Sequence, residues 1–96
     1  MSRTFTWTNP ITSPAWPAMR DPQITLMDGI YWMTATYPPF FDGPCPGVPL
    51  YSSRNLLDWK FETWLLRRDD APDKAWYKER WWAPEIHRKH NKFWLT

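Results

Sequence analysis

Residues 22–34 read PQITLMDGIYWMT, and this stretch decides the fold because the chain of 96 residues nearly repeats it. Residues 84–96 read PEIHRKHNKFWLT, so that each matching position lies 62 residues further on, without a gap. Proline, isoleucine, tryptophan and threonine recur unchanged, and Asn91 replaces Gly29. A repeat of this kind predicts a structural unit that buries its faces only against neighbouring copies.

Each copy has the pattern of a β-hairpin. In the first copy, residues 23–27 and 30–37 alternate as paired strands do, and Asp28-Gly29 between them is a strong signal for a tight hairpin turn. The second copy predicts another hairpin, which turns at His90-Asn91.

The residues between the two copies predict a further pair of strands. Residues 38–47 are rich in proline and glycine and are expected to form a loop. Residues 48–52 and 59–66 then have strand-like sequences, so that four strands follow one another with short connections, as in one blade of a β-propeller. The charged residues 67–80 are expected to cross to the next blade, with a helical turn over 73–79.

These elements predict an all-β protein with a first blade at about residues 20–66, a crossing loop at 67–80 and the start of a second blade at 81–96. The second copy stops at Thr96, where the first copy continues into further strands. We therefore expect residues 1–96 to be an N-terminal fragment of one larger domain, holding about one and a half blades.

Composition narrows the classes of function. Aromatic residues make up 19% of the chain, and eleven prolines stand against three glycines, which suits short strands and proline-rich loops better than helices. The net charge of +2 comes from mixed basic and acidic residues, so no electrostatic footprint for nucleic acid is present. No apolar run is long enough to span a bilayer, and Met1–Pro10 lacks a signal-peptide pattern, so we expect a cytoplasmic protein without a membrane partner.

The number and spacing of the cysteine and histidine residues indicate neither a catalytic nucleophile nor a metal site. Cys45 is the one cysteine and has no His and acid partners at a recognisable spacing, so we expect a buried or loop thiol. His87 and His90 lack a third ligand, so we expect no metal site.

The two copies differ at the residue before the repeated proline, where Asp21 aligns with Ala83. Because alanine serves in one copy, folding does not require the carboxylate in the other. Pro22 is expected to hold Asp21 in an extended conformation. Asp21 is either a hydrogen-bond acceptor at a strand start or, as we favour, a general base or anion-stabilising carboxylate where blade starts converge. Arg20 is either its ion-pair partner or, with slight preference, a surface charge.

Several short motifs occur together in one order along the chain. They are Asn9-Pro10-Ile11, Arg20-Asp21-Pro22-Gln23-Ile24, Gly29-Ile30-Tyr31-Trp32, Gly47-Val48-Pro49-Leu50-Tyr51-Ser52-Ser53, Asn55-Leu56, Trp59 and Trp82-Ala83-Pro84-Glu85-Ile86. Each motif alone is weak, but in this order and spacing the set resembles the N-terminal part of glycoside hydrolase family 43.

That resemblance implies a five-bladed β-propeller that hydrolyses arabinose- or xylose-containing saccharides with inversion at the anomeric carbon. Inverting enzymes use a base and an acid about 6.5–9.5 Å apart, with the attacking water between them. The family's Asp-Pro motif falls on Asp21, which implies that Asp21 is the general base. The family's general acid and the aspartate that tunes its pKa lie in later blades, so the chain alone is expected to be inactive.

The resemblance also implies two substrate-binding aromatic residues. Trp82 matches the tryptophan that lines the family's sugar pocket, although a tryptophan packed between blades fits the sequence equally well. Tyr37 falls where related enzymes place an aromatic ring near the glycone. Glu85 aligns with Gln23 in the repeat, and neighbouring strand residues point to opposite faces, so we do not expect Glu85 to be the missing acid. Some relatives hold calcium in the central channel, but residues 1–96 predict no cofactor site.

Three alternatives to the hydrolase stay open. The first is a non-catalytic carbohydrate-binding or degenerate propeller, and the second is a related five-bladed family that acts on fructosides, against which the motif at residues 82–86 counts. The third is an incomplete gene product that does not fold stably, because one and a half blades leave open strand edges. We favour the hydrolase for the parent protein and the third alternative for the isolated polypeptide.

Overall fold

The computed structural model describes residues 19–41, 43–75, 78 and 81–96. This part of the chain is all-β, as the sequence predicts, and none of its helices is long and apolar enough to cross a membrane. Its elements are β1 (Arg20–Met27), β2 (Ile30–Thr36), β3 (Gly47–Ser53), β4 (Lys60–Arg67), the 3-10 helix η1 (Arg68–Asp70), β5 (Ile86–Lys89) and β6 (Lys92–Leu95).

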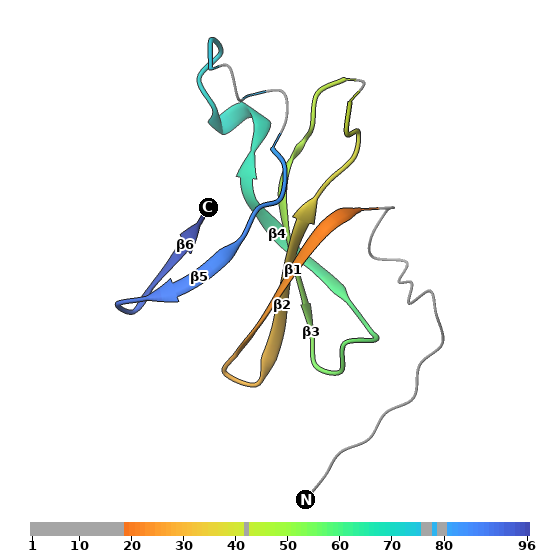
Figure 1. Ribbon diagram of the computed structural model, residues 1–96, viewed down its shortest axis with the longest axis vertical. Helices are drawn as coiled ribbons and strands as arrows, with labels where there is room; N and C mark the ends of the chain where they lie inside the picture. Colours follow the sequence, from red (N-terminus) through yellow and green to blue (C-terminus); the bar gives the residue numbers. More distant parts are fainter. Residues whose placement is uncertain (1–18, 42, 76–77, 79–80) are drawn as a thin grey trace, which may run out of the picture.

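The strands form two antiparallel sheets (Figure 1). Strands β1 to β4 lie in sequence order in one sheet, and β5 and β6 form a separate hairpin, with β5 next to β1. In Figure 1 the start of β1 and the end of β2 lie at the upper end of the larger sheet, and the turn between them lies at its lower end. One end of the larger sheet therefore carries the start of β1 and the end of β2, and the other end carries the turn between these strands.

The repeat in the sequence is also a repeat in three dimensions. Strands β1 and β2 pair Ile24 with Met33, and β5 and β6 pair the residues 62 positions further on, Ile86 with Leu95. The same offset relates Leu26↔Tyr31 to Arg88↔Phe93. The two hairpins thus share one register.

Both hairpins turn through two residues with positive φ. The angles are 54° and 79° at Asp28-Gly29, and 53° and 58° at His90-Asn91. Two-residue loops of this kind match the right-handed twist of the strands that they join. Both predicted turns are confirmed.

A buried hydrophobic cluster lies on the face of the four-stranded sheet that carries Met33. Met33, Tyr51 and Trp59 form a buried cluster, and Tyr31 and Leu56 pack against it. Burial raises the pKa of the Tyr51 phenol to about 12. Strand pairing places Gln23 on the opposite face, from which its side chain reaches β5.

Two expectations concern residues that the structure describes only in part. The helical turn expected over residues 73–79 falls partly on residues 76, 77 and 79, which lie outside the described residues. A 3-10 turn lies at Arg68–Asp70, where the Arg67 N–H donates to Asp70 Oδ2 at 2.8 Å. The motif Asn9-Pro10-Ile11 also lies outside the described residues.

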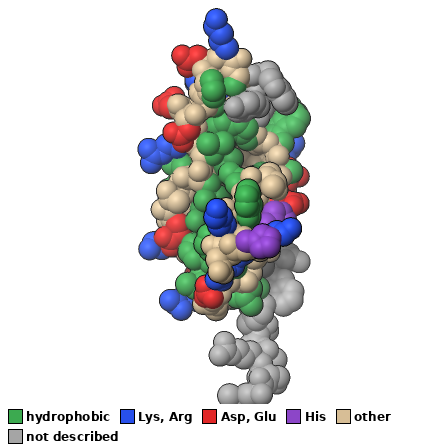
Figure 2. Space-filling view, turned by 90° about the vertical axis from the view of Figure 1, so that its left-hand side faces the viewer, with side chains coloured by type: hydrophobic (Ala, Val, Ile, Leu, Met, Phe, Trp, Pro, Cys, Tyr) green, Lys and Arg blue, Asp and Glu red, His purple; other side chains and the backbone are tan. Residues whose placement is uncertain are grey.

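The hairpin of β5 and β6 carries much exposed apolar surface. Phe93 is 64% exposed, Trp94 51% and Leu95 39%. Figure 2 shows hydrophobic side chains gathered along the middle of the side of the molecule that includes this hairpin, with charged groups flanking them. This distribution is what a repeat unit leaves uncovered where no neighbouring copy packs on it.

Candidate functional site

Asp21 and Trp82 line the same small pocket, at the end of the sheet where β1 begins and β2 ends. The pocket has a volume of about 200 Å³. Its other lining residues are Arg20, Thr36, Phe40 and Phe41. Residues 61 positions apart in the sequence therefore meet at one cavity.

A β-bulge sets the direction of Asp21. Pairing passes from Arg20↔Thr36 directly to Gln23↔Thr34, which leaves one extra residue in β1. The φ angle of Asp21 is 53°, so the expectation of an extended backbone at this residue was wrong. The extra residue kinks the strand and turns a side chain out of the regular alternation, and this outweighs the preference that the following proline imposes.

The same backbone geometry recurs in the second copy, where Ala83 precedes Pro84 with a φ angle of 50°. A left-handed conformation costs a residue other than glycine about 1–2 kcal/mol. Because alanine and aspartate both adopt it here, the strained backbone belongs to the repeat. The carboxylate is the feature that distinguishes the first copy.

The Asp21 carboxylate is held by a buried hydroxyl. Thr36 Oγ1 donates a hydrogen bond to Asp21 Oδ2 at 2.9 Å and accepts one from the Ala83 N–H at 2.7 Å. Thr36 is 2% exposed, whereas Asp21 is exposed. Within the described part of the chain, no hydrogen bond engages the second carboxylate oxygen, Oδ1. One oxygen is thus fixed and the other is available to the pocket.

Aromatic rings form the apolar wall of the pocket. Trp82 is 57% exposed, and its indole meets the edge of Phe41 with 5.9 Å between ring centroids. The Arg20 guanidinium lies over the Phe40 ring at 4.4 Å and near the Phe41 ring at 5.6 Å. The ion pairs among the described residues do not include one between Arg20 and Asp21. Arg20 therefore contributes a stacked cation, with a cation–π attraction of about 0.5–1 kcal/mol at an exposed site.

Tyr37 does not line this pocket. Its ring packs edge-on against Trp64, with 5.0 Å between centroids, and its carbonyl accepts a weak hydrogen bond from the Cys45 thiol at 3.6 Å. Cys45 is 2% exposed, so the expectation of a buried thiol is confirmed. The structure thus brings together Asp21 and Trp82 but leaves Tyr37 outside.

Sequence reasoning missed Thr36, Phe40 and Phe41 as pocket residues. The two phenylalanines could have been found from their position. They lie in the proline-rich loop directly after β2, whose end pairs with the start of β1, and a loop offers aromatic rings no core in which to pack. Thr36 carried no such signal, since an alternating strand gives a threonine no special status.

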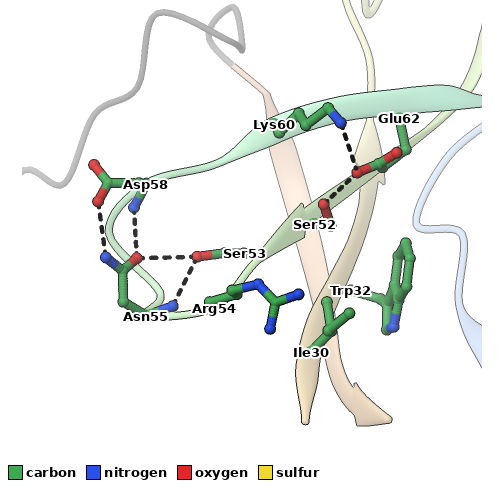
Figure 3. A pocket seen from close by; sticks show the side chains of 9 residues that line it. All are labelled: Ile30, Trp32, Ser52, Ser53, Arg54, Asn55, Asp58, Lys60 and Glu62. Atoms are coloured by element: carbon green, nitrogen blue, oxygen red, sulfur yellow. Dashed lines mark hydrogen bonds and ion pairs between the residues drawn. The ribbon is translucent and has the colours of Figure 1, made fainter. Parts of the chain in front are cut away.

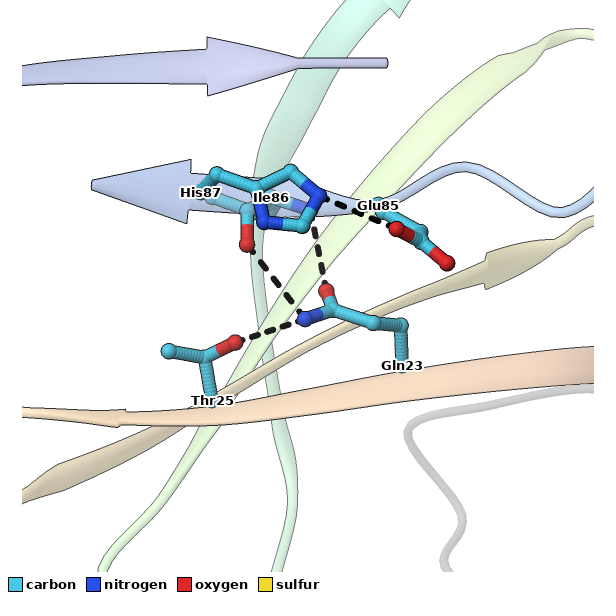
Figure 4. A network of polar contacts seen from close by, with 5 residues as sticks. All are labelled: Gln23, Thr25, Glu85, Ile86 and His87. Atoms are coloured by element: carbon cyan, nitrogen blue, oxygen red, sulfur yellow. Dashed lines mark hydrogen bonds and ion pairs between the residues drawn. The ribbon is translucent and has the colours of Figure 1, made fainter. Parts of the chain in front are cut away.

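Glu85 lies apart from the pocket. Its carboxylate pairs with His87 Nε2 at 3.0 Å, and both side chains are about half exposed (Figure 4). In the described residues, no three His, Cys, Asp or Glu side chains lie close enough together to hold a metal ion.

A larger pocket of about 430 Å³ lies at the opposite end of the sheet (Figure 3). Several of its polar groups bond to one another: Ser52 donates to Glu62 at 2.6 Å, and Asn55 donates to Asp58 at 2.7 Å. Lys60 also pairs with Glu62 at 3.7 Å. We prefer the smaller pocket as the candidate site, because it holds an exposed carboxylate with a free oxygen at the position where the repeat breaks.

The chain was also compared with known protein families. The family model for glycosyl hydrolases family 43 matches residues 7–96.

The chain belongs to glycosyl hydrolase family 43. No curated protein and no solved structure gave a significant match. Family 43 is a family of glycoside hydrolases, so membership indicates hydrolysis of glycosidic bonds in general and carbohydrates as the substrates. The all-β architecture agrees with a β-propeller family.

Proposed function

We propose that the protein containing this chain is an inverting glycosidase for arabinosyl or xylosyl linkages, built as a five-bladed propeller, with Asp21 as the general base. One observation carries the proposal. The carboxylate at the position where the repeat breaks faces a pocket that also holds an exposed tryptophan. Family membership supplies the class of reaction.

Asp21 has the arrangement that a general base needs. Because Thr36 occupies Oδ2, the free Oδ1 accepts a proton from a water molecule in the pocket. The water oxygen forms its bond to the anomeric carbon while the bond from that carbon to the leaving oxygen breaks. A general acid from sequence outside residues 1–96 protonates the leaving oxygen, about 6.5–9.5 Å from the base.

Trp82 supplies the apolar surface for the sugar ring. The face of an indole suits the C–H face of a pyranose or furanose, and aromatic packing of this kind excludes water from one side of the ring. Arg20, stacked on Phe40, carries hydrogen-bond donors beside the same pocket. Tyr37 packs on Trp64 instead. We therefore assign the main sugar contact to Trp82, with Tyr37 supporting the end of β2 next to Thr36.

The test is an assay of the full reading frame that contains this chain, on aryl arabinofuranosides and aryl xylosides. Asp21→Asn is expected to lower kcat by about 10²–10⁴-fold, because an amide cannot accept the proton. Asp69→Asn makes the same chemical change at an exposed residue of η1 and serves as the control. NMR of the first-formed sugar should show an inverted anomeric configuration.

A non-catalytic carbohydrate-binding protein is the second candidate, because the exposed Trp82 indole would bind sugar without any acid. Titration of the product of the full reading frame with arabino- and xylo-oligosaccharides, followed by tryptophan fluorescence, measures binding separately from turnover. Saturable binding lost in Trp82→Ala, together with an inactive full reading frame, would replace the hydrolase with this second function.

A further inference from the structure

We propose that Thr36 is a positioning residue for Asp21, and that it links the orientation of the carboxylate to the docking of the second repeat. The inference rests on the proposed function. It starts from the buried Oγ1 of Thr36 at the end of β2. This oxygen bonds to both the Asp21 carboxylate at the start of β1 and the Ala83 N–H in the segment leading to β5.

The hydrogen bonds of the Thr36 hydroxyl define its direction. A hydroxyl has a single hydrogen and two acceptor lone pairs. The Ala83 N–H, at 2.7 Å, occupies a lone pair, and the single hydrogen is then donated to Asp21 Oδ2 at 2.9 Å. Because Thr36 is 2% exposed, solvent competes little for the hydroxyl. The bond is charge-assisted when the carboxylate is ionised, which makes it stronger than a bond between neutral groups.

The Ala83 N–H is itself held in place by the backbone that follows it. Pro84 has no N–H. The next donor, Glu85 N–H, bonds to the Thr96 carbonyl at 2.8 Å, and the Ile86 N–H bonds to Gln23 Oε1 at 2.9 Å. Thr36 therefore joins Asp21 to a segment that is anchored on both the second hairpin and β1.

Thr34 provides a matched control on the same strand. It lies two residues before Thr36, so both side chains have the same orientation in β2. Thr34 is fully buried, and its Oγ1 has no hydrogen-bond partner among the residues that the structure describes. Thr34→Val therefore removes a hydroxyl that makes no contact, whereas Thr36→Val removes one that makes two.

The test measures kcat and KM of the full reading frame on the aryl glycoside that it hydrolyses. Thr36→Val should lower kcat by about 10–100-fold, because a displaced base loses its alignment with the water. KM should change far less, because the substitution removes no atom of Trp82 or of the other aromatic rings that line the pocket. Thr36→Ser keeps the hydroxyl and should restore kcat to near the parent value, and Thr34→Val should leave kcat unchanged.

Two results would overturn the inference: a loss in Thr36→Ser as large as that in Thr36→Val, or an equal loss in Thr34→Val. Either would show that packing at β2, and not the hydroxyl, controls the rate. If Thr36→Val does not fold, Thr36→Ala against Thr36→Ser asks the same question, because those side chains differ by the hydroxyl alone.

An amide-exchange measurement on the product of the full reading frame is independent of activity. Thr36→Val should speed exchange of the Ala83 amide relative to Thr34→Val, because that N–H loses its acceptor; unchanged protection would contradict the hydrogen-bond link. An inactive parent, or an Asp21→Asn variant as active as the parent, would overturn the proposed function and with it the positioning role. If the parent is active and Asp21→Asn lowers its kcat, but Thr36→Val does not, this inference alone would be overturned.

Discussion

At the scale of single residues, the close approach of two backbones explains one glycine. A Cβ atom added to Gly47 would meet the carbonyl oxygen of Leu66 and lie 3.1 Å from Trp64 Cε3. Gly47→Ala should therefore lower the free energy of unfolding by about 1–3 kcal/mol, because the paired strands β3 and β4 have to separate locally. Chemical denaturation of the product of the full reading frame measures this loss.

Gly29→Ala is the comparison for Gly47→Ala. A Cβ at Gly29 meets nothing within 4 Å, but the φ angle of 79° makes the substitution strained. It tests backbone strain alone, at about 1 kcal/mol. If Gly47→Ala costs no more than Gly29→Ala, the close approach of β3 to β4 is not the reason for glycine at position 47.

The Tyr51 phenol predicts a pH dependence at the same scale. Burial raises its pKa from 10.0 to about 12, so the folded chain binds this proton more tightly than the unfolded chain. Between pH 10.0 and about 12, the unfolded state has lost this proton and the folded state still holds it, so the free energy of unfolding falls as pH rises. Denaturation at several pH values across this window should show the slope, and Tyr51→Phe should reduce it.

Tyr31→Phe is the control for the alkaline slope, because Tyr31 packs at the border of the same cluster and is less buried than Tyr51. It should leave most of the slope in place. An equal slope in the Tyr51→Phe variant and the parent would show that other groups govern alkaline unfolding.

At the scale of secondary structure, the two hairpin turns differ in their second residue. Gly29 accepts positive φ without strain, whereas Asn91 occupies the same place in the β5–β6 turn with a φ angle of 58°. Asn91→Gly should therefore stabilise the second hairpin by about 0.5 kcal/mol, and Gly29→Asn should destabilise the first by a similar amount. Amide exchange in each hairpin measures the two effects separately. Exchange should slow in the second hairpin of Asn91→Gly and quicken in the first hairpin of Gly29→Asn, and changes of the same sign would contradict the prediction.

The elements were predictable where the sequence signal is local. Alternation and turn chemistry over a few residues located both hairpins, β3 and β4 to within one to three residues. The start of β1 is the clearest miss, at Arg20 instead of Gln23, because the bulge at Asp21 interrupts the alternation while the strand continues. A pattern read with period two does not report an inserted residue.

At the scale of the whole molecule, the sequence located Asp21 and Trp82 by the repeat and the family resemblance but did not predict their surroundings. Thr36 and Ala83 are 47 residues apart, and their hydrogen bond arises from the packing of one hairpin on another sheet. The stacking of Arg20 on Phe40 likewise joins a strand to a loop. No local pattern records such contacts, so the sequence could single out Asp21 as a candidate but could not predict its hydrogen bond to Thr36.

One amide side chain joins the two sheets. Gln23 Oε1 accepts the Ile86 N–H at 2.9 Å, and Gln23 Nε2 donates to the Ile86 carbonyl at 3.3 Å and to Thr25 Oγ1 at 2.7 Å (Figure 4). Gln23→Glu keeps the acceptor but places a carboxylate oxygen against that carbonyl. It should weaken the docking of the second hairpin by about 1–3 kcal/mol, which faster exchange of the Ile86 amide would reveal.

Glu85→Gln makes the reverse exchange at the aligned position of the second repeat and is the control. Glu85 pairs with His87 at an exposed site, where an ion pair contributes about 0–1 kcal/mol, so this change should leave the docking intact. Because the Ala83 N–H lies on the docked segment, Gln23→Glu should also lower kcat of the full reading frame, while Glu85→Gln should not. Equal exchange rates in the two variants would mean that Gln23 does not hold the sheets together, and that the base is positioned without the second repeat.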